Sequence, residues 1–515
     1  MLQPLPIGVQ DFNKVRTEGY MYVDKTALLY RLVKTGSYYF LSRPRRFGKS
    51  LLVSTLEAYF QGRKELFKGL AIEGLEKDWA VHPVFHLDLN TQKYDAPEKL
   101  DQVLNRALTR WEELYGASEA EATLSLRFEG VIRRACEQTG QGVVILVDEY
   151  DKPMLQAIGN EELQEDYRST LKAFYGALKS MDRYIRLGLL TGVTKFSKVS
   201  VFSDLNNLED ISMDNRYADL CGITEEELRD NFKEYVCKLA DKYRIPEEEA
   251  YIRLKEHYDG YHFTEDSEGL YNPFSLLNAL AKQKFGNYWF ETGTPTYLVE
   301  LLKRSHYDLR RLTQERTSGE VLDSIDTASD HPVPLLYQSG YLTIKDYNPR
   351  FDVYTLDFPN KEVEEGLLKF LIPYYTPINK VESPFQVEQF VKEVEAGDVD
   401  GFFRRLQSFL ADTPYELARE QELHYQNVLF IVFKLVGLYV QAEYHTSQGR
   451  VDLLLQTPDY VYVMEFKLEG TAEEALRQIE EKGYARPFDS DTRRVFRIGV
   501  NFSRETRNIE RWLVE

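Results

Sequence analysis

Residues 38–50 read YYFLSRPRRFGKS, a short apolar run followed by a basic loop that ends in Gly-Lys-Ser. Residues 48–60 continue with helical spacing. A strand, a loop and a helix N-terminus in this order direct free backbone N–H groups toward an anion. The stretch therefore predicts a phosphate-binding loop at the end of a strand in an α/β domain.

Each residue of this loop has an expected role in binding ATP. Gly48 would let the backbone approach the phosphates, Lys49 would reach the β and γ phosphates, and Ser50 would ligate Mg²⁺. Arg43 departs from the general pattern G-x-x-x-x-G-K-[ST], because it stands in place of the first glycine. The alternative is a basic helix start on a solvated surface. We expect the nucleotide contacts to be Arg45, Arg46, Phe47, Gly48, Lys49, Ser50 and Leu51.

A second, acidic element supports a nucleotide site. Residues 142–151 read GVVILVDEYD, an apolar strand that ends in acids. Asp148 would hold Mg²⁺ through water, and Glu149 would polarise the attacking water as the catalytic residue of hydrolysis. Taken alone, the same pattern would fit a buried strand capped by a polar turn. Together with the loop at 43–50, it predicts a nucleotide-hydrolysing site.

Four apolar runs alternate with longer helical patterns between residues 36 and 195. The runs cover 38–41, 84–89, 143–147 and 185–190. Strands buried on both faces have this near-continuous apolar composition, so we expect a P-loop NTPase with a parallel sheet and helices on both faces. Thr191 and Thr194 follow the last run and would contact the γ-phosphate. A strand end with a capping threonine is an equal alternative.

A hairpin is predicted near the C-terminus. Residues 449–467 read GRVDLLLQTPDYVYVMEFK, which we interpret as two strands around the turn TPDY. Proline in the second position and aspartate in the third suit a type I turn. If Thr457 and Tyr460 close it, Asp452 lies directly opposite Glu465 on one face of the sheet. Lys467 projects from the same face, because side chains alternate along a strand.

The grouping of Asp452, Glu465 and Lys467 predicts a metal-dependent nuclease site. Two adjacent carboxylates repel unless a cation lies between them. Mg²⁺, or Mn²⁺, would bind both carboxylates and a phosphate of DNA or RNA, and would generate the attacking hydroxide. A surface aspartate beside an exposed Glu–Lys pair is the alternative. Met464 and Phe466 alternate with the charges, which indicates one buried face and one face reserved for charge.

The chain as a whole suggests three parts. We expect an ATPase core at 1–222, a helical lid and linking segment at 223–360, and a restriction-endonuclease-like α/β domain with preceding helices at 361–515. In the last part, Glu422 opens an amphipathic stretch and Gln478 lies in a helical one, and both are weaker candidates for accessory roles. A chain of 515 residues is too long for one core, which agrees with several domains.

The composition limits the partners. The formal net charge is −19, from 64 basic and 83 acidic residues, so a nucleic-acid substrate would need a local basic surface or a metal. Three cysteines are too few for a disulfide framework or a zinc site. The N-terminus lacks signal-peptide features and no apolar run is long enough to cross a membrane. We therefore expect a cytoplasmic protein that is not associated with a membrane.

Together, these motifs resemble the AAA-ATPase-like proteins fused to a PD-(D/E)XK nuclease domain, a family common in bacteria. The matching motifs are YVDKT (22–26), RPRRFGKS (43–50), VDEYD (147–151), YDGY (258–261), YNP (271–273), GRVD (449–452), EFK (465–467) and the stretch from Gln478 to Tyr484. The resemblance implies ATP and Mg²⁺ as cofactors, nucleic acid as a partner and a homo-oligomer as a candidate assembly. The nucleotide site would comprise Lys49, Ser50, Asp148 and Glu149. The nuclease site would comprise Asp452, Glu465 and Lys467, with Glu422 and Gln478 as accessories.

Two functions fit these motifs. In the first, nucleotide binding or hydrolysis controls cleavage by the nuclease domain. In the second, the chain is a nucleotide-dependent switch or scaffold whose nuclease fold binds nucleic acid or a partner without cutting. Asp452→Ala would separate them, because only the first function needs the carboxylate. A nucleic-acid motor is a weaker third hypothesis, since the sequence has no helicase motif beyond the two nucleotide-site elements.

Overall fold

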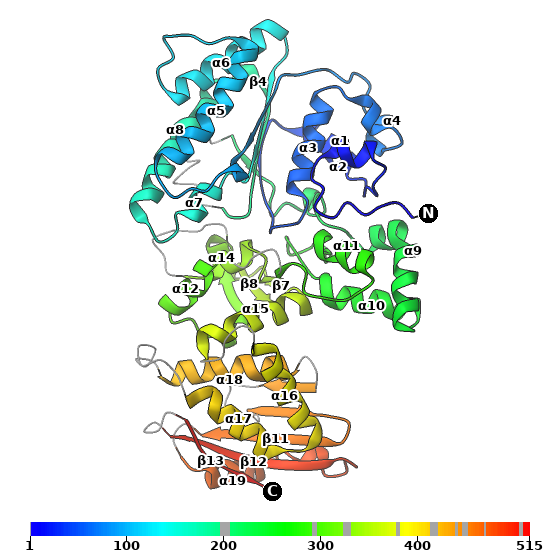
Figure 1. Ribbon diagram of the computed structural model, residues 1–515, viewed down its shortest axis with the longest axis vertical. Helices are drawn as coiled ribbons and strands as arrows, with labels where there is room; N and C mark the ends of the chain where they lie inside the picture. Colours follow the sequence, from blue (N-terminus) through cyan, green and yellow to red (C-terminus); the bar gives the residue numbers. More distant parts are fainter. Residues whose placement is uncertain are drawn as a thin grey trace. The chain divides into compact units, whose positions relative to one another are not determined.

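The computed structural model describes residues 2–195, 207–290, 296–322, 331–376, 382–411, 421–437, 441–444, 452–467, 470–503 and 508–515. The chain divides into two compact units, whose elements are labelled in Figure 1. Unit 1 comprises Met1–Leu301 and Gln314–Glu362, and unit 2 comprises Leu302–Thr313 and Val363–Glu515. Within the described residues, no helix is both long and apolar enough to span a membrane.

Unit 1 contains a five-stranded parallel sheet in the order β2-β3-β4-β1-β5. Its strands are β1 (Tyr38–Ser42), β2 (Val84–Asp88), β3 (Val143–Asp148), β4 (Ile185–Gly192) and β5 (Glu209–Asp210). The first four strands lie where the apolar runs predicted them. Every residue of β1 and β3 is buried, as expected for strands that are covered on both faces. The carboxyl ends of β1, β4 and β3 are neighbours at one edge of the sheet.

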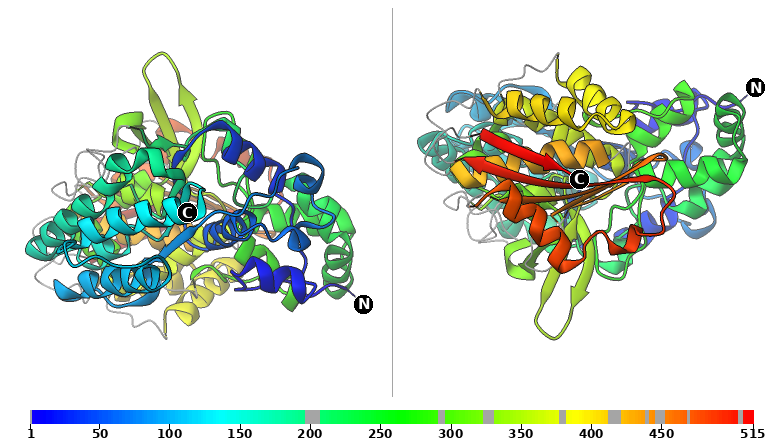
Figure 2. Two further views of the ribbon diagram at one scale, coloured as in Figure 1. Left: turned by 90° about the horizontal axis from the view of Figure 1, so that it is seen from above. Right: turned by 90° about the horizontal axis from the view of Figure 1, so that it is seen from below.

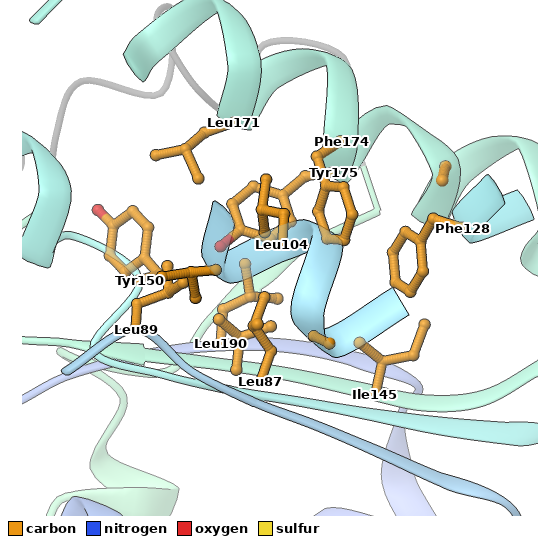
Figure 3. Close-up of a cluster of buried hydrophobic side chains, with 14 of the residues drawn as sticks. Leu87, Leu89, Leu104, Phe128, Ile145, Tyr150, Leu171, Phe174, Tyr175 and Leu190 are labelled. Carbon is orange, nitrogen blue, oxygen red and sulfur yellow. The ribbon is translucent and has the colours of Figure 1, made fainter. Parts of the chain in front are cut away.

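Helices cover both faces of this sheet (Figure 1). One face carries α5 (Glu98–Tyr115), α6 (Leu124–Thr139) and α8 (Glu161–Ser180). Figure 3 shows the core between them, where Leu87, Ile145 and Leu190 of the sheet meet Leu104, Phe128 and Phe174 of the helices. On the other side, α3 (Lys49–Phe60) packs on β3 and on α1 (Phe12–Thr17), while α2 (Thr26–Thr35) packs on α4 (Ala71–Leu75).

A layer of three helices follows the sheet in sequence and remains in unit 1. It consists of α9 (Glu225–Tyr243), α10 (Glu247–Tyr258) and α11 (Pro273–Lys282), which share one hydrophobic core. α9 begins with a capping box, in which Thr224 and Glu227 exchange side-chain and backbone hydrogen bonds. Leu5 and Ile7 pack against the same core, so the first residues of the chain lie beside this layer.

Unit 1 ends with a small antiparallel sheet in the order β6-β8-β7. The chain passes through β6 (Glu315–Ser318), α13 (Gly319–Leu322), α14 (Val333–Gln338), β7 (Thr343–Asn348) and β8 (Val353–Asp357). In this sheet the first strand, β6, pairs with the last, β8. Figure 2 shows the β7–β8 hairpin extending away from the helices of its unit. By contrast, α14 is buried along most of its length.

Unit 2 is built around a mixed sheet in the order β13-β12-β11-β10-β9. Its strands are β9 (Gln441–Tyr444), β10 (Leu453–Gln456), β11 (Tyr460–Lys467), β12 (Arg494–Ser503) and β13 (Asn508–Val514). The central pair β11 and β12 is parallel, and α19 (Ala472–Lys482) makes the crossover between them. Gly499 lets α19 lie close to β12, because an added Cβ would meet the carbonyl oxygen of Ala472 at 2.2 Å.

Four further helices belong wholly or largely to unit 2. They are α15 (Lys361–Tyr375), α16 (Ser383–Ala396), α17 (Val399–Ala411) and α18 (Gln421–Gly437). Phe433 of α18 contacts Phe466 of β11, and the Tyr462 hydroxyl donates to the carbonyl of Val394 in α16. These helices therefore cover the sheet face that carries the even-numbered side chains of β11.

Candidate nucleotide and nuclease sites

The predicted phosphate-binding loop connects β1 to α3, and the backbone of Gly48 and the side chain of Lys49 define its conformation. Gly48 has φ 98°, in the left-handed region that favours glycine, and α3 begins at the next residue. The ammonium of Lys49 donates to the carbonyls of Arg43 (2.9 Å) and Pro44 (3.2 Å). Burial lowers the pKa of Lys49, an effect that the carboxylates of Glu149 and Asp148 oppose. The loop thus surrounds a buried positive charge that a phosphate would neutralise.

Arg43, which replaces the first glycine of the general loop pattern, stabilises the start of the loop through buried hydrogen bonds. Its side chain is 1% exposed, and its guanidinium donates to the carbonyls of Ser42, Ser212, Tyr217 and Ala218. The guanidinium also lies 4.0 Å from the centre of the Phe263 ring. Arg43 is therefore used in the structure of the loop and does not face a ligand.

A cavity of about 260 Å³ opens in front of the loop. Its lining includes the predicted loop contacts Arg45, Arg46, Gly48, Lys49, Ser50 and Leu51, together with Glu149, the predicted catalytic residue. Asp148 does not line the cavity. Phe47 does not line it, because its ring packs against Tyr261 and Phe263. The lining is cationic and also contains Lys152, so it suits an anion with several charges.

Sequence reasoning missed part of this cavity and a neighbouring one. Residues 6–10, Asn90 and Phe274 also line the first cavity. A second, largely apolar cavity of about 110 Å³ shares Pro6, Gly48, Leu51, Pro273 and Leu277 with the first. Most of these residues are far from the loop in sequence. The signal available was the motif YNP at 271–273, which the sequence analysis used only for the family resemblance.

Two acids at the end of β3, Asp148 and Asp151, accept hydrogen bonds from two threonines at the end of β4, Thr191 and Thr194. The Thr191 hydroxyl donates to Oδ1 of Asp148 at 2.6 Å. The backbone N–H and the hydroxyl of Thr194 both donate to Oδ2 of Asp151, at 2.7 and 2.6 Å. Both threonines are fully buried and neither lines the cavity, so they lie behind the carboxylates and orient them. Asp151 is a site residue that the sequence analysis did not single out.

Glu149 has the environment of a general base. It adopts a left-handed backbone conformation with φ 52°, which is uncommon for a residue with a side chain and turns Glu149 toward the cavity. Burial raises the pKa of its carboxyl group, against the opposing effect of the Lys49 ammonium. A carboxylate with a raised pKa is a better proton acceptor for a water molecule.

Glu149→Gln should slow ATP hydrolysis by about 100-fold or more and leave ATP affinity nearly unchanged, because general bases typically contribute that much to rate and little to binding. Phosphate release and calorimetric binding would be measured on the same preparation. Glu161→Gln, at an exposed position in the first turn of α8, is the matched control. Unaltered hydrolysis in Glu149→Gln would remove this residue from the reaction.

The hairpin in unit 2 has the register that the turn predicted. The N–H of Thr457 donates to the carbonyl of Tyr460 at 2.8 Å, and the N–H of Tyr460 donates to the Thr457 hydroxyl at 2.9 Å. Leu453 is paired with Met464, so the next position along brings Asp452 opposite Glu465. Oδ2 of Asp452 accepts a hydrogen bond of 2.9 Å from the N–H of Phe466, which fixes this carboxylate beside β11.

Glu465, Lys467 and Gln478 form one hydrogen-bonded group. The Lys467 ammonium lies 3.5 Å from Oε1 of Glu465, and the Gln478 amide from α19 bonds to both side chains. Oε2 of Glu465 is buried, and no described residue donates to it. Burial and the charge of Asp452 raise the pKa of Glu465 to about 7, and burial also raises the pKa of Asp452.

These carboxylates fit a divalent cation. One oxygen of Glu465 has no donor among the described residues, and burial raises the pKa of both carboxyl groups in spite of the Lys467 ammonium, so the pair would be stabilised by further positive charge. Mg²⁺ is commonly bound through one or two carboxylates with water and substrate phosphate. Among the described residues, no group of three or more His, Cys, Asp and Glu side chains is placed to hold a metal. Asp452 and Glu465 would therefore be the side-chain ligands, with other ligands from solvent and substrate.

One expectation for this hairpin is wrong. The face that carries Glu465 is not reserved for charge, because α19 packs on it around Val461, Val463 and Ile479. Glu465 is only 3% exposed, whereas Lys467 at the end of β11 is partly exposed. The reason is that β11 is the central strand, and the parallel crossover to β12 brings a helix over this face. The backbone of Glu422 lies in α18, but its side chain is outside the described residues.

Metal affinity should depend on pH through Glu465. Its pKa of about 7 means that the carboxyl group is largely protonated below pH 7 and must lose this proton when a cation binds. We expect the apparent affinity for Mn²⁺ to fall by up to about tenfold for each pH unit below this pKa and to level off above it. Calorimetric titrations from acidic to mildly alkaline pH would test this. Glu480→Gln, on the exposed side of α19, should retain the profile, and a flat profile in the natural protein would contradict the assignment.

Sequence comparisons find a family match for the region that contains each site. Residues 6–202 match a family described as "Predicted AAA-ATPase" (AAA-ATPase-like), and residues 420–512 match the PD-(D/E)XK nuclease superfamily. A protein from Azotobacter chroococcum mcd 1, described as "Uncharacterized protein in vnfD 5'region", is 37% identical over 527 residues. That alignment covers 99% of this chain and 98% of the relative. The first match contains the phosphate-binding loop, and the second contains the hairpin.

Proposed function

The chain belongs to the family of AAA-ATPase-like proteins that carry a C-terminal PD-(D/E)XK nuclease domain, and from this we propose that it is an ATP-controlled nuclease. It binds ATP with Mg²⁺ at the end of the parallel sheet and cleaves DNA or RNA at Asp452 and Glu465. Residues 1–222 act as the ATPase core, 223–360 as the lid and linking segment, and 361–515 as the nuclease domain. The protein acts in the cytoplasm, and a homo-oligomer is its candidate assembly.

One observation carries the nuclease half of the proposal. Asp452 and Glu465 lie opposite each other, and one buried Glu465 oxygen has no donor among the described residues. Two neighbouring carboxylates, one of them buried, that share a single ammonium at 3.5 Å are costly to the fold. A protein that used this domain only as a scaffold would have no physical reason to keep them together. A cation and a phosphodiester supply that reason.

At the proposed nucleotide site, different side chains along the cavity bind different parts of ATP. Arg45, Arg46, Lys49 and Lys152 attract the phosphates, while the N–H groups at the start of α3 bind them. The apolar cavity at Leu51, Pro273 and Leu277 takes the base. When bound, Mg²⁺ would neutralise phosphate charge, with Ser50 as a side-chain ligand and Asp148 holding it through water. Glu149 accepts the proton of the attacking water, and Thr191 keeps Asp148 in place.

In the nuclease half, four side chains bind and orient the reacting groups. Asp452 and Glu465 would hold the cation, which supplies an acidic water and neutralises charge on the phosphate. Lys467 donates a hydrogen bond to the phosphate or the water, since its ammonium lies beside Glu465 and is partly exposed. Gln478 restrains Lys467 and Glu465 together, so it is a positioning residue. Glu422 remains an accessory candidate on sequence grounds.

The test is a cleavage assay with plasmid, linear duplex DNA, single-stranded DNA and RNA. Each substrate is incubated with purified full-length protein in Mg²⁺ or Mn²⁺, with and without ATP. We expect at least one substrate to be cleaved only when a divalent cation is present, at a rate that ATP changes. Binding of every substrate without cleavage, under all metal and nucleotide conditions, would instead favour the nucleotide-dependent switch or scaffold.

A further inference from the structure

Trp289 touches the phosphate-binding loop directly, although it lies far from it in sequence. The indole N–H of Trp289 donates to the carbonyl of Arg45 at 3.2 Å. Its ring packs against Tyr341, with the ring centres 5.1 Å apart, and the side chain is 6% exposed. The loop carbonyl and the indole are thus paired in an environment where an unpaired polar group is costly.

The backbone of Trp289 makes a second bond, to the opposite side. Its N–H donates to Oε1 of Glu362 at 2.8 Å, and Glu362 is fully buried. Glu362 is the second residue of α15 and the last residue of unit 1, since Val363 belongs to unit 2. Trp289 therefore bonds both to the phosphate-binding loop and to the start of α15, the helix that continues into unit 2 at Val363.

A parallel contact links the same loop to α14. Pro44 lies so close to Gly340 that a Cβ on the glycine would come within 2.7 Å of the proline ring. Gln338 of α14 accepts from the N–H of Lys195, the residue after Thr194, at 2.7 Å. The end of α14 and the turn after it therefore contact the segment after β4 and the phosphate-binding loop.

We propose that Trp289 is the positioning residue that couples the nucleotide state of the loop to the nuclease domain. This rests on the proposed function, since it requires ATP at the loop and cleavage at the hairpin. When phosphate binds, the loop carbonyls move with the backbone N–H groups that surround it. The indole follows the Arg45 carbonyl, and Glu362 follows the Trp289 backbone, so the first turn of α15 takes one of two positions. The phosphate-binding loop and the first turn of α15 then change together between the same two conformations.

Trp289→Phe tests this coupling with a small change. Phenylalanine keeps a ring against Tyr341 and the backbone bond to Glu362, and it removes the indole N–H that donates to Arg45. ATP affinity and cleavage without ATP should stay within about twofold of the natural protein. The ratio of the cleavage rate with ATP to the rate without ATP should move toward one by a factor of at least about five. This factor corresponds to about 1 kcal/mol. Trp111→Phe, a buried residue stacked on Phe85 of the sheet, is the matched control and should keep the natural ratio.

A second measurement follows the contact itself. Adding ATP to the natural protein should change its tryptophan fluorescence, and this change should disappear in Trp289→Phe but remain in Trp111→Phe. An unchanged ATP ratio in Trp289→Phe would overturn the coupling. A natural protein that binds ATP and cleaves nucleic acid at the same rate with and without ATP would overturn both this coupling and the ATP control in the proposed function, and would leave ATP binding and cleavage as separate activities. Absence of ATP binding by calorimetry, or of all cleavage, would refute the proposed function itself.

Discussion

Asp452→Asn will reduce nucleic-acid cleavage by more than about 100-fold. Substitution of residues that merely orient metal ligands already costs about 10–100-fold in affinity or activity, so loss of a ligand should cost more. Asparagine is chosen because its carbonyl oxygen can still accept the hydrogen bond from the Phe466 N–H. The variant therefore keeps the hairpin contact and removes the charge. Cleavage of the best substrate would be measured at saturating Mn²⁺.

The control for this variant lies in the same hairpin. Asp459→Asn changes an exposed carboxyl group at the turn and should cleave at the natural rate. Thermal unfolding of both variants shows whether unit 2 remains folded. If Asp452→Asn retained natural cleavage while Mn²⁺ was still required, the cation would have to be bound elsewhere, and the assignment of this hairpin as the nuclease site would be abandoned.

Lys49→Met will weaken ATP binding by about 100-fold or more. Removing one partner of a buried, hydrogen-bonded charge pair typically costs roughly 2–5 kcal/mol, which is about 30- to several-thousand-fold in affinity. Methionine retains a flexible apolar stem in the space that the lysine stem fills. Binding of ATP would be measured calorimetrically in the presence of Mg²⁺. Lys64→Met, at an exposed lysine, is the matched control.

Lys49 also bonds to the carbonyls of Arg43 and Pro44, so its replacement can disturb the loop as well as the ligand. Ser50→Ala separates these effects, because Ser50 lines the cavity and the loop carbonyls do not depend on it. We expect Ser50→Ala to lose most of the Mg²⁺ dependence of ATP binding without a change in unfolding temperature. Natural affinity in both Lys49→Met and Ser50→Ala would exclude this cavity as the nucleotide site.

The sequence predicted the features that depend on local patterns. The strands β1 and β3 are continuous apolar runs because both of their faces are covered, and this composition is visible without a structure. The register of the hairpin was also readable, since Thr457 and Tyr460 close a short turn and each later pair follows from it. The positions of Lys49, Glu149, Asp452 and Glu465 relative to their strands were therefore predictable.

The sequence could not predict the features that depend on contacts between distant segments. Thr191 was expected at the phosphate, but it donates to Asp148 from behind the cavity. The covering of the Glu465 face follows from the crossover through α19, which the alternation of Met464 and Phe466 does not report. Residues 6–10 and Phe274 reach the cavity only because the N-terminal segment packs on the helical layer. No short motif encodes these arrangements.

Arg43 has consequences for how the loop binds a triphosphate and for the sequence pattern by which such loops are identified. Where the general pattern G-x-x-x-x-G-K-[ST] has its first glycine, this chain has a guanidinium that donates to four carbonyls. The start of the loop is thereby fixed before a triphosphate arrives, so less conformational entropy is lost there on binding, while the residues from Arg45 onward can still change conformation. A pattern search that insists on the first glycine passes over such chains, whereas one that admits arginine there and requires a distant segment to supply the carbonyls would find them.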